Sequence, residues 1–154
     1  MRTDSRPLKT KKSIKQALLI LLKEKDISCI TISELAIAAS VSRKTFYLHY
    51  RDISEILDEI KNDLLDLFNE SVMKERRVGF RVRMLNFINN IVKRVNADER
   101  YYALMASSNY AKIIFDPLED KLKEELIFAL DTETKLEQEK KECLVDFMIG
   151  GIIN

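Results

Sequence analysis

The chain has 154 residues, of which 46% are hydrophobic and 33% are charged, and its formal net charge is +1. This length can bury the cores of one small and one medium helical unit. With 3 glycines and 1 histidine, the sequence has no glycine-rich phosphate loop and no histidine metal cluster, so we expect no enzyme, metal or cofactor.

Composition also indicates where the protein resides. No stretch reaches the roughly 18 continuous apolar residues that a membrane span needs, and no segment suited to a signal peptide follows the polar residues 1–7. Cys29 and Cys143 lie far apart in sequence, which suits a reducing compartment better than a disulfide scaffold. We therefore expect a cytoplasmic protein with no membrane partner.

Apolar residues recur at helical spacing along the chain, whereas strand-like alternation is scarce, so the sequence predicts an all-α fold. Residues 8–25 are predicted to form the first helix, which closes the core behind the segment that follows. Its apolar stripe consists of Ile14, Ala17, Leu18, Leu21 and Leu22.

Residues 31–50 carry the signals of two short helices joined by a tight turn. Thr31 and Glu34 have the spacing of a capping box, in which a hydroxyl and a carboxylate satisfy backbone donors at a helix start. They predict a helix over residues 32–39, with small residues on the face where the second helix crosses.

A second helix is predicted directly after the first. Ser42 can cap a helix over residues 43–48, which leaves Ser40 and Val41 as the link. So short a link forces the helices to cross steeply, with Phe46 as the apolar plug beneath the turn.

The predicted second helix presents cations and hydroxyls on its polar face. A major groove is about 12 Å wide and admits such a helix, with the first residues nearest the base edges. The segment therefore predicts docking on DNA. The polar face consists of Ser42, Arg43, Lys44, Thr45, Tyr47 and His49.

The last residues of this segment follow a six-position pattern. It consists of threonine, an apolar residue, tyrosine, any residue, histidine or tyrosine, and an aromatic residue. The residues in that pattern are Thr45, Phe46, Tyr47, Leu48, His49 and Tyr50. The segment resembles the N-terminal DNA-binding domain of the TetR family of transcriptional regulators, over about residues 13–57. The resemblance implies base or groove contacts from Arg43, Lys44 and Thr45. The phosphate contacts that it implies come from Thr31, Ser42, Tyr47 and His49.

The chain departs from the family pattern in the turn and in the contact positions. Ser40 stands where the family often has glycine, so it is expected to bear a positive φ at modest cost. Lys44 stands where many members have glycine and adds a long cation at the groove. Ile53 replaces a common lysine, and Arg51 is the substitute for that phosphate contact.

Charge is divided unequally along the chain. Residues 1–51 contain 11 basic and 4 acidic side chains, whereas residues 52–154 contain 15 basic and 21 acidic ones. A basic N-terminal part followed by an acidic remainder predicts that the N-terminal end of the molecule binds a polyanion. If about four to six cations per subunit neutralise phosphates, log affinity falls with log salt by roughly 0.9 per contact. The alternative for Lys9, Lys11, Lys12 and Lys15 is a solvated helix face.

Beyond this N-terminal part, the predicted helices are longer. A helix from Asp52 or Ser54 to about residue 75 must leave the small unit and enter the larger one. Because such a helix is stiff, a shift of its C-terminal end in the larger unit also moves the small N-terminal unit. Gly79 marks a break, and a helix over residues 80–95 follows. Its apolar stripe is predicted to be Met84, Leu85, Ile88 and Ile91.

Capping signals place the remaining helices. Asn96 with Glu99 predicts a helix over residues 97–107, and Asp116-Pro117 predicts a start after a short helical piece. The expected ranges are 109–115 for the short piece and 117–130 for the helix proper. Thr134 with Glu137 predicts a last helix from about Lys135, which ends in an apolar run without a C-cap.

Aromatic and methionine side chains of the larger unit are candidates for lining a ligand pocket, because such residues line adaptable apolar cavities. Ordinary core packing is the competing interpretation for each. The candidates are Phe87, Tyr101, Tyr102, Met105, Tyr110, Phe115 and Phe147.

Other features of the larger unit predict structure and no chemistry. The carboxylate pairs Glu119-Asp120 and Glu124-Glu125 alternate with lysines, which favours a solvated face. Gly150-Gly151 is expected to allow close helix packing, in the core or at a dimer seam.

The sequence thus predicts a helix-turn-helix DNA-binding domain over residues 1–52 and a helical regulatory and dimerisation domain over residues 53–154. The family pairs its last two long helices with those of a partner, and this chain contains one of them in part, so we expect either that its C-terminus is truncated or that its larger unit is unusually short. The resemblance implies a homodimeric repressor that reads a near-palindromic operator and is released by a small-molecule inducer. The alternative is a helical protein-interaction module of TetR-like fold controlled by a protein partner.

Overall fold

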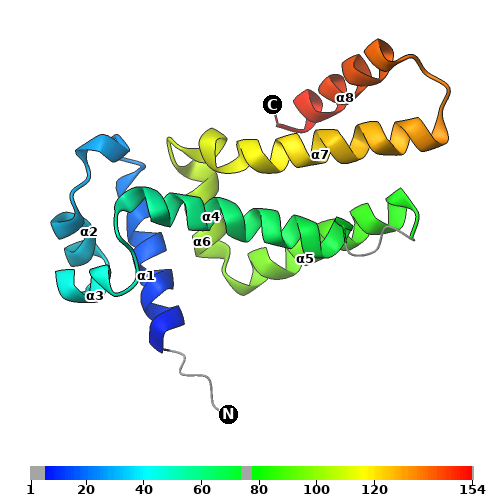
Figure 1. The fold of residues 1–154 in the computed structure, drawn as a ribbon. Helices are drawn as coiled ribbons and strands as arrows, with labels where there is room; N and C mark the ends of the chain where they lie inside the picture. The colour runs from blue at the N-terminus through cyan, green and yellow to red at the C-terminus, as the bar shows by residue number, and fades with distance from the viewer. Residues whose placement is uncertain (1–5, 74–77, 154) are drawn as a thin grey trace.

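The computed structural model describes residues 6–73 and 78–153, and within these ranges its regular elements are all helices (Figure 1). The all-α prediction is therefore confirmed. The elements in chain order are α1 (Arg6–Leu21), the 3-10 helix η1 (Ile27–Cys29), α2 (Ile32–Ala38), α3 (Arg43–Tyr47), α4 (Ile53–Phe68), the π turn η2 (Asn69–Met73), α5 (Phe80–Ala97), α6 (Glu99–Ser107), α7 (Ala111–Glu133) and α8 (Gln138–Ile153).

Helices α1, α2 and α3 form a small unit, which we call the head. α1 ends at Leu21, earlier than predicted, because the amide groups of Lys23 and Glu24 bond to carbonyls three residues back and tighten the chain into a turn. Fully buried side chains from all three helices and from the start of α4 make the core. They include Ile14, Leu18, Leu22, Leu35, Phe46 and Ile56.

Helix α4 joins the head to the remaining helices, which we call the body (Figure 1). Asp52 caps it, since the Glu55 amide donates to the Asp52 carboxylate at 2.9 Å. Its apolar face is buried along the whole helix. That face consists of Ile56, Leu57, Ile60, Leu64, Leu67 and Phe68.

In the body, α4 packs beside α5 and α7, and α8 folds back along α7 (Figure 1). Phe68 and Phe87 meet edge to face, with ring centroids 5.2 Å apart. A buried Arg83 on α5 donates to the Val72 carbonyl at 3.1 Å and to the Glu125 carboxylate at 3.0 Å. The prediction of a solvated face is therefore wrong for Glu125, which is 2% exposed and neutralises Arg83.

Several predicted features of the body are wrong. Leu85 and Ile88 of α5 are 59% and 49% exposed, whereas Arg83 and Phe87 take the buried positions. Asp98, and not Asn96, caps α6 through a 3.3 Å bond from the Tyr101 amide.

The proline and threonine signals also failed. α7 runs continuously through Pro117, because the packing of a single long helix along α4 outweighs the backbone bond that proline cannot make. Thr134 ends α7 and does not start α8, since its hydroxyl donates to the Leu130 carbonyl at 2.7 Å. α8 begins at Gln138 instead. Within the described ranges, no helix combines the length and apolarity needed to cross a bilayer.

Candidate nucleic-acid interface

The turn between α2 and α3 is a helix-terminating motif with serine in the left-handed position. Ser40 has a φ of 57°, as predicted. The Ser40 amide donates to the Ile37 carbonyl at 3.0 Å, and the Val41 amide donates to the Ala36 carbonyl at 2.9 Å. These bonds satisfy the last carbonyls of α2 and turn the chain sharply into α3.

The predicted serine cap of α3 is confirmed. The Ser42 hydroxyl accepts the Thr45 amide at 2.9 Å and also lies 2.8 Å from the Thr45 hydroxyl. The cap of α2 is confirmed as well, because the Thr31 hydroxyl accepts the Glu34 amide at 3.2 Å. The Glu34 carboxylate pairs with Lys25, and this bond lowers the pKa of Glu34.

Phe46 fixes which face of α3 looks outward. Its side chain is fully buried, with the Tyr47 ring edge-on at 5.6 Å and the Tyr50 ring at 6.1 Å. Anchoring Phe46 inside leaves the first turn of α3 on the surface, and Arg43 and Lys44 are both exposed.

The residues predicted to contact DNA lie together on the surface of the head. Thr31, Ser42, Arg43, Lys44 and Tyr47 are exposed, while Thr45 and His49 are half-buried. Within the described part of the chain, no ion pair involves either Arg43 or Lys44. The start of α3 therefore offers cations that are available to an external anion.

Three lysines of α1 differ, because carboxylates of α4 and the Asp98 cap of α6 neutralise them. Lys11 lies 2.7 Å from Glu59, and Lys12 lies 2.6 Å from Asp98. Lys15 is buried and meets Glu59 at 2.8 Å and Asp63 at 2.6 Å. Neither a phosphate-binding role nor a merely solvated face describes these three lysines.

Burial raises the pKa of Glu59, but hydrogen bonds from Lys11 and Lys15 outweigh it and hold the pKa below its usual value. Glu59 is therefore ionised near neutral pH, and the ion pairs hold α1 against α4. The sequence could not reveal this cluster, because its members come from helices 48 residues apart.

Arg51 and Ile53, at the positions where the contact pattern departs from the family, lie in different surroundings. Ile53 is half-buried and packs against the head core. Arg51 is 91% exposed in its side chain, and its closest carboxylate is Glu55 at 3.8 Å. Arg51 is thus free to reach outward beside α3.

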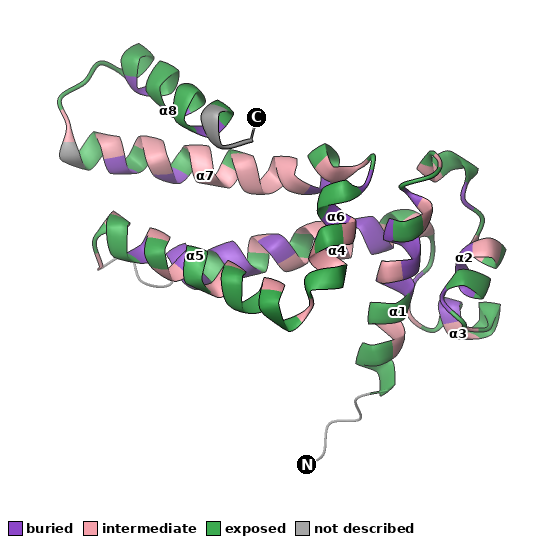
Figure 2. Cartoon of the chain, turned by 180° about the vertical axis from the view of Figure 1, so that it is seen from behind, coloured by how far each residue is buried: buried purple, intermediate pink, exposed green. Residues whose placement is uncertain are grey.

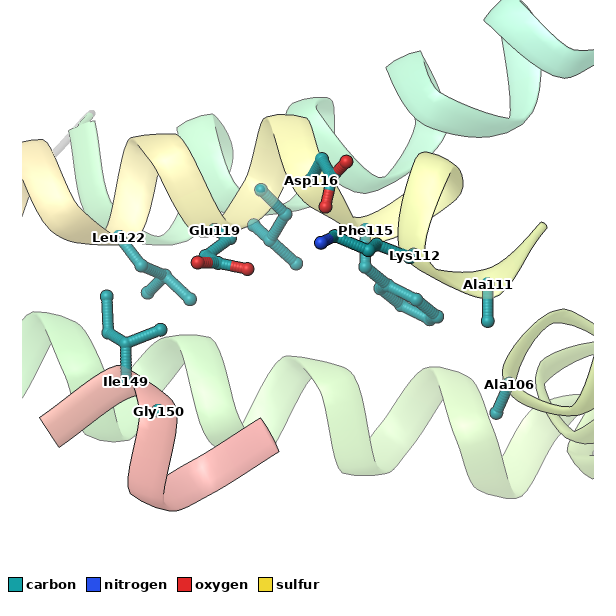
Figure 3. A pocket seen from close by; sticks show the side chains of 10 residues that line it. Ala106, Ala111, Lys112, Phe115, Asp116, Glu119, Leu122, Ile149 and Gly150 are labelled. Carbon is teal, nitrogen blue, oxygen red and sulfur yellow. The ribbon is translucent and has the colours of Figure 1, made fainter. Parts of the chain in front are cut away.

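The body contains a hollow of about 800 Å³ between α6, α7 and the end of α8. Figure 3 shows Leu122 and Ile149 at one end of it and Ala106 and Ala111 at the other. A smaller apolar hollow of about 370 Å³ adjoins it across Phe115, which lines both.

Few of the predicted pocket residues line these hollows. Phe115 lines both and Tyr102 lines the smaller one. Met105 and Phe87 are core residues that are 1% and 4% exposed. The Phe87 ring fills the core of the body, and one end of the larger hollow is lined by the small side chains of Ala106 and Ala111.

The other three candidates lie away from the hollows. Tyr101 packs against the head core, and burial is the main cause that raises its pKa above the usual range. Phe147 is 78% exposed on the outer side of α8. Tyr110 bonds to Asp26 of the head at 2.6 Å.

Gly150 does not mediate close packing within the chain. A Cβ built on it would meet nothing within 4 Å, and the residue is exposed. The prediction of a core role for Gly150 is therefore wrong, and the side-chain surroundings of Gly151 lie outside the described residues.

Comparison with known proteins gives a partial match. No family model matches the chain. A 58-residue stretch is 41% identical to an uncharacterised HTH-type transcriptional regulator of Bacillus subtilis (strain 168), YxbF. The match covers 38% of this chain and 15% of the relative, so the chain spans a small fraction of that protein's length.

Proposed function

We propose that this protein is a DNA-binding transcriptional regulator of the TetR type, in which α3 reads the major groove. The observation that carries this proposal is the pair of exposed cations, Arg43 and Lys44, in the first turn of a capped helix. Most other lysines of the head form ion pairs with carboxylates, so unpaired positive charge is concentrated in the first turn of α3. The partial likeness to an HTH-type transcriptional regulator supports the same role.

The proposed roles follow from position on the helix. Arg43 and Lys44 stand where the first residues of a reading helix face base edges, with Thr45 behind them. The remaining residues are placed to hold the backbone of the duplex. These phosphate-binding residues are Thr31, Ser42, Tyr47 and His49, with Arg51 in place of the family lysine.

The salt dependence of binding to a mixed-sequence duplex tests this function. On a duplex without the operator, Arg43, Lys44 and Arg51 are each expected to neutralise about one phosphate, while Lys11, Lys12 and Lys15 are held by carboxylates, so the contacts number about three per head, fewer than composition suggests. Log affinity is then expected to fall with log salt at a slope of about −3 per head. The measurement is a fluorescence anisotropy titration at several salt concentrations.

Two variants make this measurement specific. Arg51→Ala should make the slope shallower by about 0.9, whereas Lys12→Ala, whose cation pairs with Asp98, should leave it unchanged. A wild-type protein without salt-dependent affinity for duplex DNA would favour the alternative, a helical module controlled by a protein partner.

We further propose that the regulator is a homodimer that meets its partner copy through α8. Figure 2 shows most of α8 as exposed. Its α8 outer stripe, defined as Cys143, Leu144, Phe147 and Gly150, presents apolar groups opposite the buried Val145. Phe147 is 78% exposed, and the glycine leaves room for a second helix to approach closely. Two heads about 34 to 36 Å apart would read a near-palindromic operator.

Disulfide cross-linking tests this dimer, because Cys143 lies in the α8 outer stripe. Mild oxidation of the Cys29→Ser variant is expected to yield a covalent dimer rapidly at low micromolar concentration. The matched Cys143→Ser variant retains Cys29 on the head, which is also exposed, and should remain monomeric on a denaturing gel. Equal cross-linking of the two variants, or none with Cys143, would contradict an α8 interface.

The hollow of the body is the proposed site for a small-molecule inducer that releases DNA. Its lining is mainly apolar and includes the ionisable groups Lys112, Asp116 and Glu119. A cytoplasmic repressor that loses affinity when this site fills is the mode of regulation that we propose.

A further inference from the structure

The turn between α6 and α7 docks on the head, far away in sequence from the residues that it meets. The Tyr110 hydroxyl donates to the Asp26 carboxylate at 2.6 Å and accepts the Ile27 amide at 3.0 Å. Next to it, the Asn109 side chain donates to the Lys23 carbonyl at 3.2 Å, and its amide lies 3.4 Å from the Leu22 carbonyl. We call Asn109 and Tyr110 the clasp.

On the head side, the clasp holds the segment that leads into α2. Asp26 caps η1, accepting the Ser28 amide at 2.9 Å and the Ser28 hydroxyl at 2.7 Å. These bonds, from Ser28 first and then Tyr110, lower the pKa of Asp26 to about 2. The chain passes from η1 through Ile30 directly to Thr31, the cap of α2. A shift of the clasp therefore moves the start of the helix-turn-helix.

On the body side, the clasp is continuous with the walls of the 800 Å³ hollow. Ala106 on α6 lies just before it, and Ala111, Lys112 and Phe115 on α7 lie just after it. Figure 1 and Figure 2 both show this turn beside the loop that joins α1 to α2. An occupant that separates α6 from α7 must act on the turn that joins them.

We infer that Asn109 and Tyr110 are positioning residues, which set the angle of the helix-turn-helix on the body and transmit the filling of the hollow to it. This inference rests on the proposed function for its effect on DNA, but the positioning itself does not. Stiff α4, the α1 ion pairs and the packing of Met105 on the head core supply the pivot, and the clasp adds polar contacts farther along the turn that fix rotation about it.

The positioning can be measured without DNA. A donor and acceptor dye pair on the exposed Cys29 of the head and on Lys93→Cys of α5, in a Cys143→Ser background that keeps the label out of the α8 outer stripe, reports the distance between the two units. Tyr110→Phe is expected to broaden the distance distribution and to speed hydrogen exchange at the Ile27 amide. Asn109→Ala should do the same to a lesser degree, while Tyr47→Phe, which removes a hydroxyl outside the clasp, should change neither.

The transmission can be measured without knowing the inducer. Ala106→Phe places a ring in the hollow, and its affinity for a mixed-sequence duplex is expected to differ at least about fivefold from wild type. In the Tyr110→Phe background the same substitution should change affinity less than about twofold, because the Tyr110 hydroxyl that bonds the turn to Asp26 and Ile27 of the head is absent. In the Tyr47→Phe background the fivefold effect should persist.

These outcomes separate the two proposals. If wild-type protein fails to bind duplex DNA, the proposed function is wrong, while the distance and exchange measurements still decide the positioning role. If DNA binding is normal, an unchanged distance distribution in Tyr110→Phe overturns the inference. An Ala106→Phe effect that is equal with and without the Tyr110 hydroxyl overturns it too. Unchanged helical circular dichroism shows that each variant has folded.

Discussion

Arg43→Ala is expected to weaken binding to the operator by about 1 to 3 kcal/mol and to relax the sequence preference at the base pairs that Arg43 meets. The reason is that Arg43 lies in the first exposed turn of α3, where a bidentate side chain reaches base edges. Lys44→Ala should have a similar effect. The operator can be selected from a randomised duplex library, and the variants compared by anisotropy titration on it and on single-base mutants.

Tyr47→Phe supplies the control for sequence reading. Its hydroxyl is proposed to bind a phosphate, so its loss should weaken all duplexes alike and leave the ranking of the base mutants unchanged. Equal ranking in Arg43→Ala, Lys44→Ala and wild type would show that α3 does not read sequence.

The second large effect concerns stability. Phe46→Ala removes a fully buried ring that contacts Tyr47 and Tyr50, and about 3 to 5 kcal/mol of unfolding free energy should be lost. The measurement is the urea midpoint followed by circular dichroism. Because a head of three short helices has a small core, this loss is expected to unfold the head at 37 °C and abolish DNA binding.

Tyr47→Ala is the matched control, since the adjacent ring is 51% exposed. It should lower stability by less than about 1.5 kcal/mol, because much of its surface already meets water. A Phe46→Ala protein as stable as Tyr47→Ala would contradict the assignment of Phe46 as the plug beneath the turn.

The sequence predicted the head well because its signals are local. The capping serine, the linking residues and the plug all act within a few positions of one another, so spacing alone specified them. The positive φ of Ser40 was expected from the resemblance instead, because the family often has glycine at that position.

The body was predicted less well because packing between distant segments overrides local preference there. Pro117 signalled a start, yet a continuous α7 packs along α4. Thr134 has the spacing of a cap, yet its hydroxyl turned back to the Leu130 carbonyl. Leu85 fits an apolar stripe but is exposed, whereas the buried position two residues earlier is Arg83, which the Glu125 carboxylate of α7 neutralises.

The candidate pocket shows a different failure. Aromatic and methionine residues were chosen because they line cavities, but Phe87 and Met105 are buried in the core and Phe147 is exposed, while Phe115 and Tyr102 line the hollows. The hollow is bounded in part by Ala106 and Ala111, and a small side chain in a sequence does not indicate that it lines a cavity. The clasp was also missed, because Tyr110 and Asp26 are 84 positions apart.

The ion pairs of α1 bear on how such a protein would search a genome. A regulator competes for its target against millions of background sites, and every phosphate-seeking cation strengthens the background as much as the target. By spending Lys11, Lys12 and Lys15 on its own carboxylates, this chain withholds them from random sequence. Under the proposed function, its discrimination would then depend on a few side chains at the start of α3, and mutations there would change the target while the rest of the molecule stays constant.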